Sequence, residues 1–250
     1  MRKPMAEPEP QVDDTNAAAK ALIAKGEVFL GDDRSAAGCP LWGAATEADG
    51  GATVWRGERC VHYLGADGKG RTMPFKAEGI VEGATPEVVL AHNIRLETKW
   101  SDKRRKPVVR LVEEVNPCTA VWYEQRAMPW PIWNRESCYL ETWTVREDGS
   151  ILVVRESIAH PGAAFDDKQM VALREFAAQL LTPDGNGNTK YVVSTEFNVG
   201  GMLPGGLIDK QLQGMAKLAQ DLTSKLKADP ALVETLKTEA AAKLAAAGSS

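Results

Sequence analysis

The sequence lacks any uninterrupted apolar run near the roughly 20 residues that a helix needs to cross a bilayer. Its first residues, MRKPMAEPEPQ, also lack the apolar stretch of a secretory signal, so a cytoplasmic protein is expected. An organellar transit peptide is the alternative. The glutamates and prolines of residues 1–14 are more typical of a disordered tail than of an acid-poor targeting helix.

Cysteine and histidine are both scarce. The 4 cysteines lack the short paired spacing of a zinc site, and the 3 histidines form no HExxH motif, so we expect reduced structural thiols, no metal and no cofactor. Positive charge is also limited, and the net charge of −4 argues against a nucleic-acid partner. The exception is the run KRRK at residues 103–106, interpreted first as a solvated loop and alternatively as a patch for transient contact with anionic membranes.

The 250 residues are 44% hydrophobic, enough for one large domain with a substantial core. An alanine-rich stretch at residues 16–30 predicts a first helix with Thr15 as its cap, and Thr85-Pro86-Glu87 predicts a short second helix that ends near Arg95. Runs rich in β-branched and aromatic residues, separated by turn sequences, predict strands. The expected strands are 53–56, 71–75, 107–115, 119–125, 137–146, 150–158, 170–181 and 189–199. Glu147-Asp148-Gly149 is the clearest hairpin signal, and the sheet is expected to be large and antiparallel, in an α+β fold.

The C-terminal part of the chain carries an apolar stripe at spacings of three and four. Ile208, Leu212, Met215, Leu218, Leu222 and Leu226 form it. This spacing predicts an amphipathic helix laid onto the sheet. Core packing explains most of the stripe, but a sheet that wraps around one helix can also enclose a space for an apolar ligand. Pro230 then begins an alanine-rich segment, residues 231–247, expected to be an exposed or partly frayed helix within a tail over 229–250.

Several motifs occur in a characteristic order: WNRES at residues 133–137, DGS at 148–150, RES at 155–157 followed by His160-Pro161, and GGMLP at 200–204. Together they resemble the START family, the lipid-transfer domains related to steroidogenic acute regulatory protein, over residues 42–227. The resemblance implies a helix-grip fold, in which a curved antiparallel sheet wraps around a long C-terminal helix. It also implies that residues 15–228 bind a single lipid or other hydrophobic small molecule, for intracellular transfer or sensing, and a monomer is expected.

Alternation along the strands gives an independent prediction of the cavity lining, because every second side chain points to the same face. The candidate lining residues are Trp122, Glu124, Tyr139, Glu141, Trp143, Arg155, Val193, Phe197, Ile208, Leu212 and Met215. A buried carboxylate needs compensation, so Glu124 and Glu141 require Arg155 or Arg135 as a partner, a shared proton, or the polar group of the ligand. Sterol-binding members of the START family often carry an acid and an arginine in the tunnel. Two acids at the matching positions argue against a sterol here.

The resemblance further implies a gate formed by the terminal helix at residues 206–227 and the loop at 158–168. The hinge candidates are Pro161, Gly162, Gly201, Gly205 and Gly206. The alternative is that these glycines only make a tight strand-to-helix turn. Two other functions stay open. One is a cyclase/aromatase-like or hydrolytic enzyme that uses Glu124 and Glu141 as an acid–base pair, although no nucleophile with its base is visible. The other is a lipid-regulated interaction module.

Overall fold

The computed structural model describes residues 14–31, 39–48, 50–58, 61, 72–95, 108–128, 132–163, 170–200 and 213–248. The strands are β1 Thr46–Ala48, β2 Ala52–Arg56, β3 Phe75–Val81, β4 Val108–Asn116, β5 Thr119–Arg126, β6 Asn134–Val145, β7 Ile151–Ser157, β8 Met170–Ala172, β9 Arg174–Pro183 and β10 Thr189–Asn198. The helices are α1 Thr15–Leu30, α2 Pro86–Ile94, α5 Leu218–Ala228 and α6 Pro230–Ala247, and η1 Pro161–Ala163 is a single 3-10 turn.

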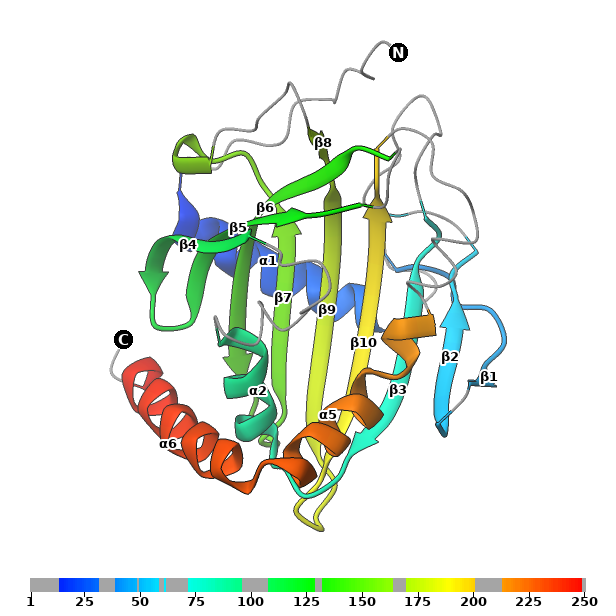
Figure 1. Cartoon of the computed structure of the whole chain (residues 1–250), viewed down its shortest axis with the longest axis vertical. Coiled ribbons are helices and arrows are strands. Elements are labelled where there is room, and N and C mark those ends of the chain that lie inside the picture. The colour runs from blue at the N-terminus through cyan, green and yellow to red at the C-terminus, as the bar shows by residue number, and fades with distance from the viewer. Residues whose placement is uncertain are drawn as a thin grey trace.

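The described strands form one sheet in the order β1-β2-β3-β10-β9-β7-β6-β5-β4 (Figure 1). All neighbours along this path pair antiparallel, which confirms the predicted α+β fold with a large antiparallel sheet. The exception to the predicted pairing is β8, which pairs with β6 in parallel. The predicted hairpin is present: β6 and β7 pair across the Glu147-Asp148-Gly149 turn, where Gly149 has a φ of 78° that only glycine adopts readily.

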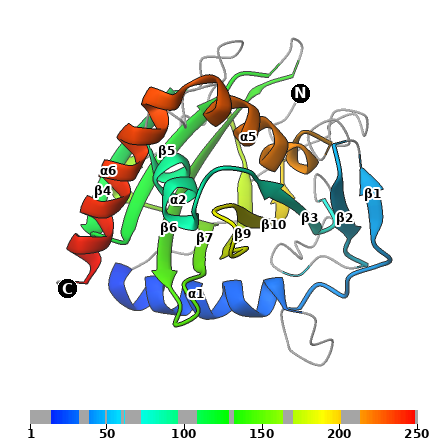
Figure 2. The same ribbon diagram turned by 90° about the horizontal axis from the view of Figure 1, so that it is seen from below.

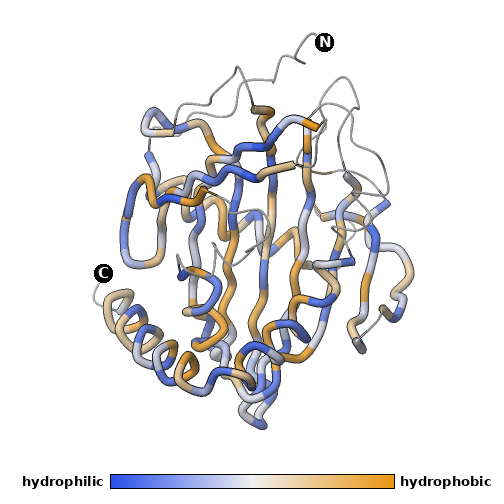
Figure 3. The backbone as a smooth tube through the Cα atoms, in the orientation of Figure 1, coloured by the Kyte–Doolittle hydropathy of each residue, from blue (hydrophilic) through white to orange (hydrophobic). Residues whose placement is uncertain are grey.

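The helices lie on opposite faces of the sheet. Seen from below, α1 runs under one face, whereas α2, α5 and α6 lie on the other, which we call the inner face (Figure 2). On the α1 side, Leu22 and Phe29 pack with Val154 and other apolar strand residues. Val154 belongs to β7, and its neighbour Val153 points to the inner face, where it packs with residues of α2, α5 and α6. This alternation follows from the two-residue period of a strand, and hydrophobic and hydrophilic segments alternate along the strands in Figure 3.

The N-cap of α1 differs from the predicted one. Asp14, and not Thr15, is the N-cap of α1, because its Oδ1 accepts hydrogen bonds of 3.0 Å from the backbone N–H groups of Asn16 and Ala17. The second helix begins with Pro86 behind the N-cap Thr85, as predicted, and ends before Arg95.

The predicted strand at residues 71–75 is wrong in its position, since β3 begins only at Phe75 and continues to Val81. Gly79 lies inside this strand, although glycine is more typical of turns than of strands. The structure gives the reason: a Cβ at Gly79 would lie 2.9 Å from the Cβ of Ala219 in α5. The missing side chain lets the helix approach the sheet closely at this point.

The alanine-rich C-terminal segment is helical, as predicted, but it is not an exposed or frayed tail. Within α6, Leu236 is fully buried and Ala240 is nearly so, and Leu232 and Leu244 pack against the same inner-face core. These four residues follow one another at intervals of four, which is the spacing of a helix face. The helix therefore belongs to the folded core, where it packs chiefly on α2.

Candidate ligand-binding site

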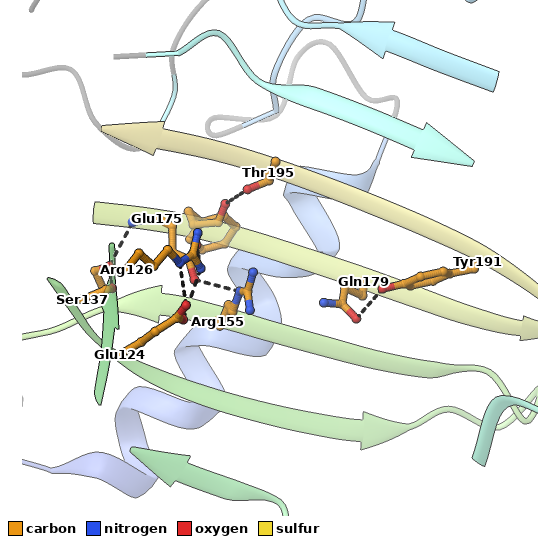
Figure 4. A network of polar contacts seen from close by, with 10 residues as sticks. Glu124, Arg126, Ser137, Arg155, Glu175, Gln179, Tyr191 and Thr195 are labelled. Atoms are coloured by element: carbon orange, nitrogen blue, oxygen red, sulfur yellow. Dashed lines mark hydrogen bonds and ion pairs between the residues drawn. The ribbon is translucent and has the colours of Figure 1, made fainter. Parts of the chain in front are cut away.

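Polar side chains from three strands meet on the inner face of the sheet. Figure 4 shows Glu124 and Arg126 of β5, Arg155 of β7 and Glu175 of β9 grouped together. In antiparallel neighbours, residues two apart on one strand share a face, so Glu124 and Arg126 point to the same side. We call these four residues the charge ladder.

The charge ladder alternates acid and arginine. Arg126 donates from Nε to Glu124 Oε1 at 2.6 Å and from Nη2 to Glu124 Oε2 at 3.2 Å. The same Nη2 lies 3.7 Å from Glu175 Oε2, and Arg155 Nε lies 3.0 Å from Glu175 Oε1. The Glu175 side chain is completely inaccessible to solvent. A buried carboxylate is costly unless opposite charges surround it, and Glu175 has a guanidinium on either side.

Both guanidinium groups stay charged. Burial is the largest influence on the pKa of Arg126 and lowers it, but the negative charges of Glu124 and Glu175 more than offset this and raise the pKa overall. Burial also lowers the pKa of Arg155, and Glu175, Tyr139 and Glu141 together turn the shift upward. Glu141 lies directly opposite Arg155 in the β6–β7 register. The inner face therefore carries two positive charges, Arg126 and Arg155, and each lies between acidic side chains.

A second polar group lies farther along the inner face. The Tyr191 hydroxyl donates to Gln179 Oε1 at 3.0 Å (Figure 4). Asn93 of α2 donates to the same oxygen at 2.9 Å. Burial raises the pKa of Tyr191 to about 12, so its hydroxyl is protonated at neutral pH. This group ties α2 to the centre of the sheet.

The two arginines of the charge ladder are only partly covered by protein. Burial is the largest single influence on the pKa of each, so both groups are shielded from much of the solvent. Even so, 27% of the Arg126 side-chain surface and 24% of the Arg155 side-chain surface remain accessible. The charge ladder therefore keeps two charged groups that a small molecule on this face could reach.

A pocket of about 730 Å3 lies at the other end of the sheet, between strands β1, β2 and β3 and the residues that lead into α5. Its lining consists of Gly43, Ala44, Thr46, Ala48, Val54, Arg56, Phe75, Gln213, Gly214, Ala216 and Lys217. It has the size expected for a ligand site and borders the predicted terminal helix. Among the described residues, none of the candidate lining residues named from the sequence belongs to it.

Most of the candidate lining residues lie on the inner face but in different places. Trp122 and Tyr139 form a small cluster with Val109, whereas Trp143 packs in the core beneath α2 and α5. Val193 packs near the start of α5, where Met215 is partly buried. Phe197 lies opposite Glu175 in the β9–β10 register. Ile208 and Leu212 lie outside the described residues.

The partners expected for the two acids need correction. Glu124 pairs with Arg126, which the sequence-based interpretation did not consider, although a spacing of two on one strand puts both on one face. Arg135 pairs with neither acid: it donates to the backbone oxygens of Val199 at 2.5 Å and Gly200 at 3.1 Å, and so anchors the end of β10. Glu175 was missed altogether. The argument against a sterol considered only the two acids at the matching positions, and it did not take into account the pair of Glu124 and Arg126.

The predicted gate is only partly described. Gly201, Gly205 and Gly206 lie outside the described residues. Pro161 and Gly162 belong to η1, where Arg110 Nη2 donates to the Gly162 oxygen at 2.9 Å. Ala163 packs into the cluster on the α1 side. These contacts place the turn on the α1 side of the sheet, and a hinge at Pro161 and Gly162 stays a prediction.

Two further features of the described residues bear on the site. They contain no group of three or more His, Cys, Asp or Glu side chains that could hold a metal ion. None of the described helices has both the length and the apolar character that crossing a membrane would require.

Comparisons with known proteins agree with this architecture. Human STARD10 has a TM-score of 0.64 at 16% identity, covering 90% of this chain and 83% of that one. Human StAR-related lipid transfer protein 5 has a TM-score of 0.61 at 19% identity, covering 90% and 99%. An Arabidopsis thaliana protein, Protein ENHANCED DISEASE RESISTANCE 2-like, is 32% identical over 89 residues, which are 34% of this chain and only 12% of that protein's length. The sequence model of the START domain matches residues 56–230, and the chain therefore belongs to the START domain family.

Proposed function

We propose that this chain binds one lipid or other hydrophobic small molecule against the inner face of the sheet and transfers it between membranes. The observation that carries the proposal is the accessible surface that Arg126 and Arg155 keep on the otherwise largely covered inner face, because the polar group of a ligand could reach it. Membership of the START domain family supports the same ligand class. One of the structures similar in fold is itself named a lipid transfer protein.

The inner face offers the two kinds of surface that an amphiphile needs. We infer that apolar side chains of this face provide area for a hydrocarbon chain, which gains roughly 25 cal/mol for each Å2 removed from water. The charge ladder supplies fixed donors and acceptors for a polar head group. An otherwise apolar cavity holds its ligand in no particular orientation, so the few polar groups set the direction. We infer that the polar end of the ligand lies against Arg126 and Arg155.

The enzymatic alternative, with Glu124 and Glu141 as an acid–base pair, gains no support. Glu124 accepts two hydrogen bonds from Arg126, so both of its oxygens are already engaged within the wall. No described nucleophile with a base at hydrogen-bonding distance accompanies the pair. We therefore favour a carrier without chemistry on its ligand.

We further propose that the chain acts as a monomer in the cytoplasm. Residues 103–106, the basic run, lie outside the described residues, and transient contact with anionic membranes stays a proposal for them. Sedimentation with vesicles with and without phosphatidylserine, at low and high salt, tests it. Contact through these cations requires binding that falls steeply with salt and with neutralisation of the run.

Extraction of the purified protein with organic solvent, followed by mass spectrometry, tests the main proposal. A carrier should retain about one lipid per chain, and fluorescent lipid should move between donor and acceptor vesicles in its presence. Replacing Arg155 by Met should lower both occupancy and transfer of polar-headed lipids, whereas Lys20→Gln on the exposed side of α1 should change neither. An empty protein that moves no lipid would refute the proposal.

A further inference from the structure

The helix α6 lies almost wholly beyond the residues that the START model matches. The match ends at residue 230, and α6 runs from Pro230 to Ala247. It continues from α5 and lies alongside α2 (Figure 1 and Figure 2). Its apolar row, which consists of Leu232, Leu236, Ala240 and Leu244, packs into the inner-face core. The helix is therefore a feature of this chain whose role the family match does not supply.

A single residue joins α5 to α6. The Asp229 N–H donates to the backbone oxygens of Lys225 at 3.2 Å and Leu226 at 3.4 Å, where α5 ends. The Asp229 carboxylate accepts a hydrogen bond of 3.0 Å from the Leu232 N–H and so caps the start of α6. Pro230, the first residue of α6, restricts the backbone between these bonds. The joint is therefore stiff, and the C-terminal end of α5 cannot shift far without carrying α6 with it.

Two attachments hold the C-terminal end of α5 over the inner face. One is direct, because the Lys225 ammonium donates to His92 Nε2 of α2 at 3.1 Å. The other runs through α6, whose apolar row packs on α2 and the inner-face core. The helix α2 is in turn tied to the centre of the sheet, since Asn93 donates to Gln179 at 2.9 Å. The docking of α6 on α2 thus fixes one end of α5 to the sheet.

The polar contacts at the rim of α6 add little to this docking. Glu239 Oε1 lies 3.5 Å from Arg95 Nε at the end of α2, and Lys243 Nζ lies 3.5 Å from Glu114 Oε1 of β4. Both pairs are partly exposed to solvent, where ion pairs contribute little to stability. Among the described residues, the apolar row therefore supplies most of the attachment.

The sequence of α6 lets the helix leave α2 without unfolding. Its 18 residues exceed the roughly 12–15 below which an isolated helix is marginal in water. Alanine, the residue with the highest intrinsic helix propensity, is frequent along it, and the cap from Asp229 does not depend on docking. Undocking then exposes the apolar row but breaks no helical hydrogen bond, which makes it a smaller step than global unfolding.

We propose that α6 is a clasp: its docking on α2 holds α5 over the inner face, and α5 uncovers that face only after α6 leaves α2. The structure shows the docked state, and the undocked state is a minor population through which the ligand enters and leaves. The strength with which the apolar row docks then sets the rate of ligand exchange. The inference rests on the proposed carrier function, because it concerns access of the same ligand.

A reversible lock tests the clasp in the full chain. Arg95→Cys with Glu239→Cys, in a chain without its native cysteines, allows a cleavable thiol cross-linker to fix α6 on α2. The matched control is Lys25→Cys with Glu156→Cys, which ties α1 to β7 on the opposite face of the sheet. The assay follows transfer between vesicles of fluorescent phosphatidylcholine, ceramide or fatty acid, whichever the unlocked chain carries. We expect the first lock to slow transfer at least about tenfold, because exchange falls with the population of the open state. Cleavage should restore transfer, and the control lock should not change it.

Backbone hydrogen exchange gives a second readout that needs no lipid. Fixing α6 on α2 should slow the exchange of the α5 amides by about tenfold or more, because α5 then loses its local opening. Leu236→Ala is the reverse perturbation: it shortens a fully buried side chain of the apolar row and should speed both α5 exchange and lipid transfer. Leu22→Ala is its control, since Leu22 is similarly buried but belongs to the core on the α1 side, and it should affect neither. Thermal melting verifies that both variants are folded.

The two readouts separate the clasp from the carrier proposal. Lipid transfer that proceeds unchanged in the locked protein would overturn the clasp, and so would α5 amides that exchange equally fast with α6 locked and free. If no form of the protein moves lipid but the lock still slows α5 exchange, the carrier proposal fails and the clasp on α5 stands.

Discussion

His92 makes the stability of this protein depend on pH in a way that can be calculated. The residue lies on α2, is 9% exposed, and accepts a hydrogen bond at Nε2 from the Lys225 ammonium of α5 at 3.1 Å. Arg95 lies at the end of the same helix, and Asn93 Oδ1 is 3.4 Å from Nδ1. Burial, followed by the charge of Lys225, lowers the pKa of His92 from 6.5 to about 4. The ring is therefore neutral in the folded protein at physiological pH.

The direction of this pH dependence follows from when His92 takes up a proton in the unfolded and in the folded protein. In the unfolded chain His92 takes up a proton as the pH falls below about 6.5, whereas in the folded protein it resists protonation until about pH 4. Between these values the unfolded state binds more protons, so acid favours unfolding. This single group adds no pH dependence above pH 7. By pH 4 it removes about 3 kcal/mol from the free energy of unfolding, a large part of a typical domain's stability.

Urea unfolding at pH 7.5, 6.0, 5.0 and 4.5 measures the effect in the natural protein and in His92→Gln, whose side-chain oxygen can accept the same bond from Lys225. Other carboxylates also titrate in this range, so the difference between the two proteins is the informative quantity. We expect the natural protein to lose more than 2 kcal/mol over this range beyond what the variant loses. Parallel losses would show that His92 is not held neutral by its surroundings, and the reasoning would be refuted.

Two of the following changes test the packing of the core, and the third tests whether α5 moves. Leu236→Ala in α6 should lower the free energy of unfolding by about 3 kcal/mol in urea, because the side chain is fully buried; a loss near zero would mean that α6 is detachable. Gly26→Ala should destabilise by about 1–3 kcal/mol, since the new Cβ would lie 2.3 Å from Val154 Cγ2, and adding Val154→Ala should recover most of the loss. Cysteines at Glu82 and Lys227, which form an exposed ion pair, allow a cleavable thiol cross-linker to join β3's end to α5 in a cysteine-free background. If α5 moves to release lipid, vesicle transfer should slow sharply and recover on cleavage, while unchanged transfer would exclude that movement.

Local sequence signals predicted much of the fold. The strands around residues 107–158 were placed nearly to their ends, because alternation and the Asp148-Gly149 turn are short-range features. The expected single strand at 170–181 is two strands. Leu173 separates them, and its N–H donates to the Glu136 oxygen of β6 at 2.7 Å. That break depends on pairing with a strand far away in the chain, which no local pattern reveals.

The candidate site was harder to predict, because its chemistry depends on which strands are neighbours. Glu175 and Arg155 are 20 positions apart in the chain, and they meet only because β7 and β9 pair. The pair of Glu124 and Arg126 could have been predicted, since residues two apart on a strand share a face. The four-residue spacing of Leu236 and Ala240 was likewise visible, but the surrounding alanines suggested an exposed helix.

The arrangement of the charge ladder suits a protein that must both bind and release its ligand. A lone buried charge in the wall would need the ligand as its partner, and departure of the ligand would then expose an unpaired charge at a cost of several kcal/mol. Here Glu124, Arg126, Glu175 and Arg155 alternate in sign, so each charge is compensated within the wall. In the proposed binding mode the polar head of a ligand would gain hydrogen bonds from the accessible guanidinium edges, and the empty wall would stay neutralised. The free energy of binding then consists only of the modest net contribution of those hydrogen bonds and of apolar burial, as reversible transfer requires.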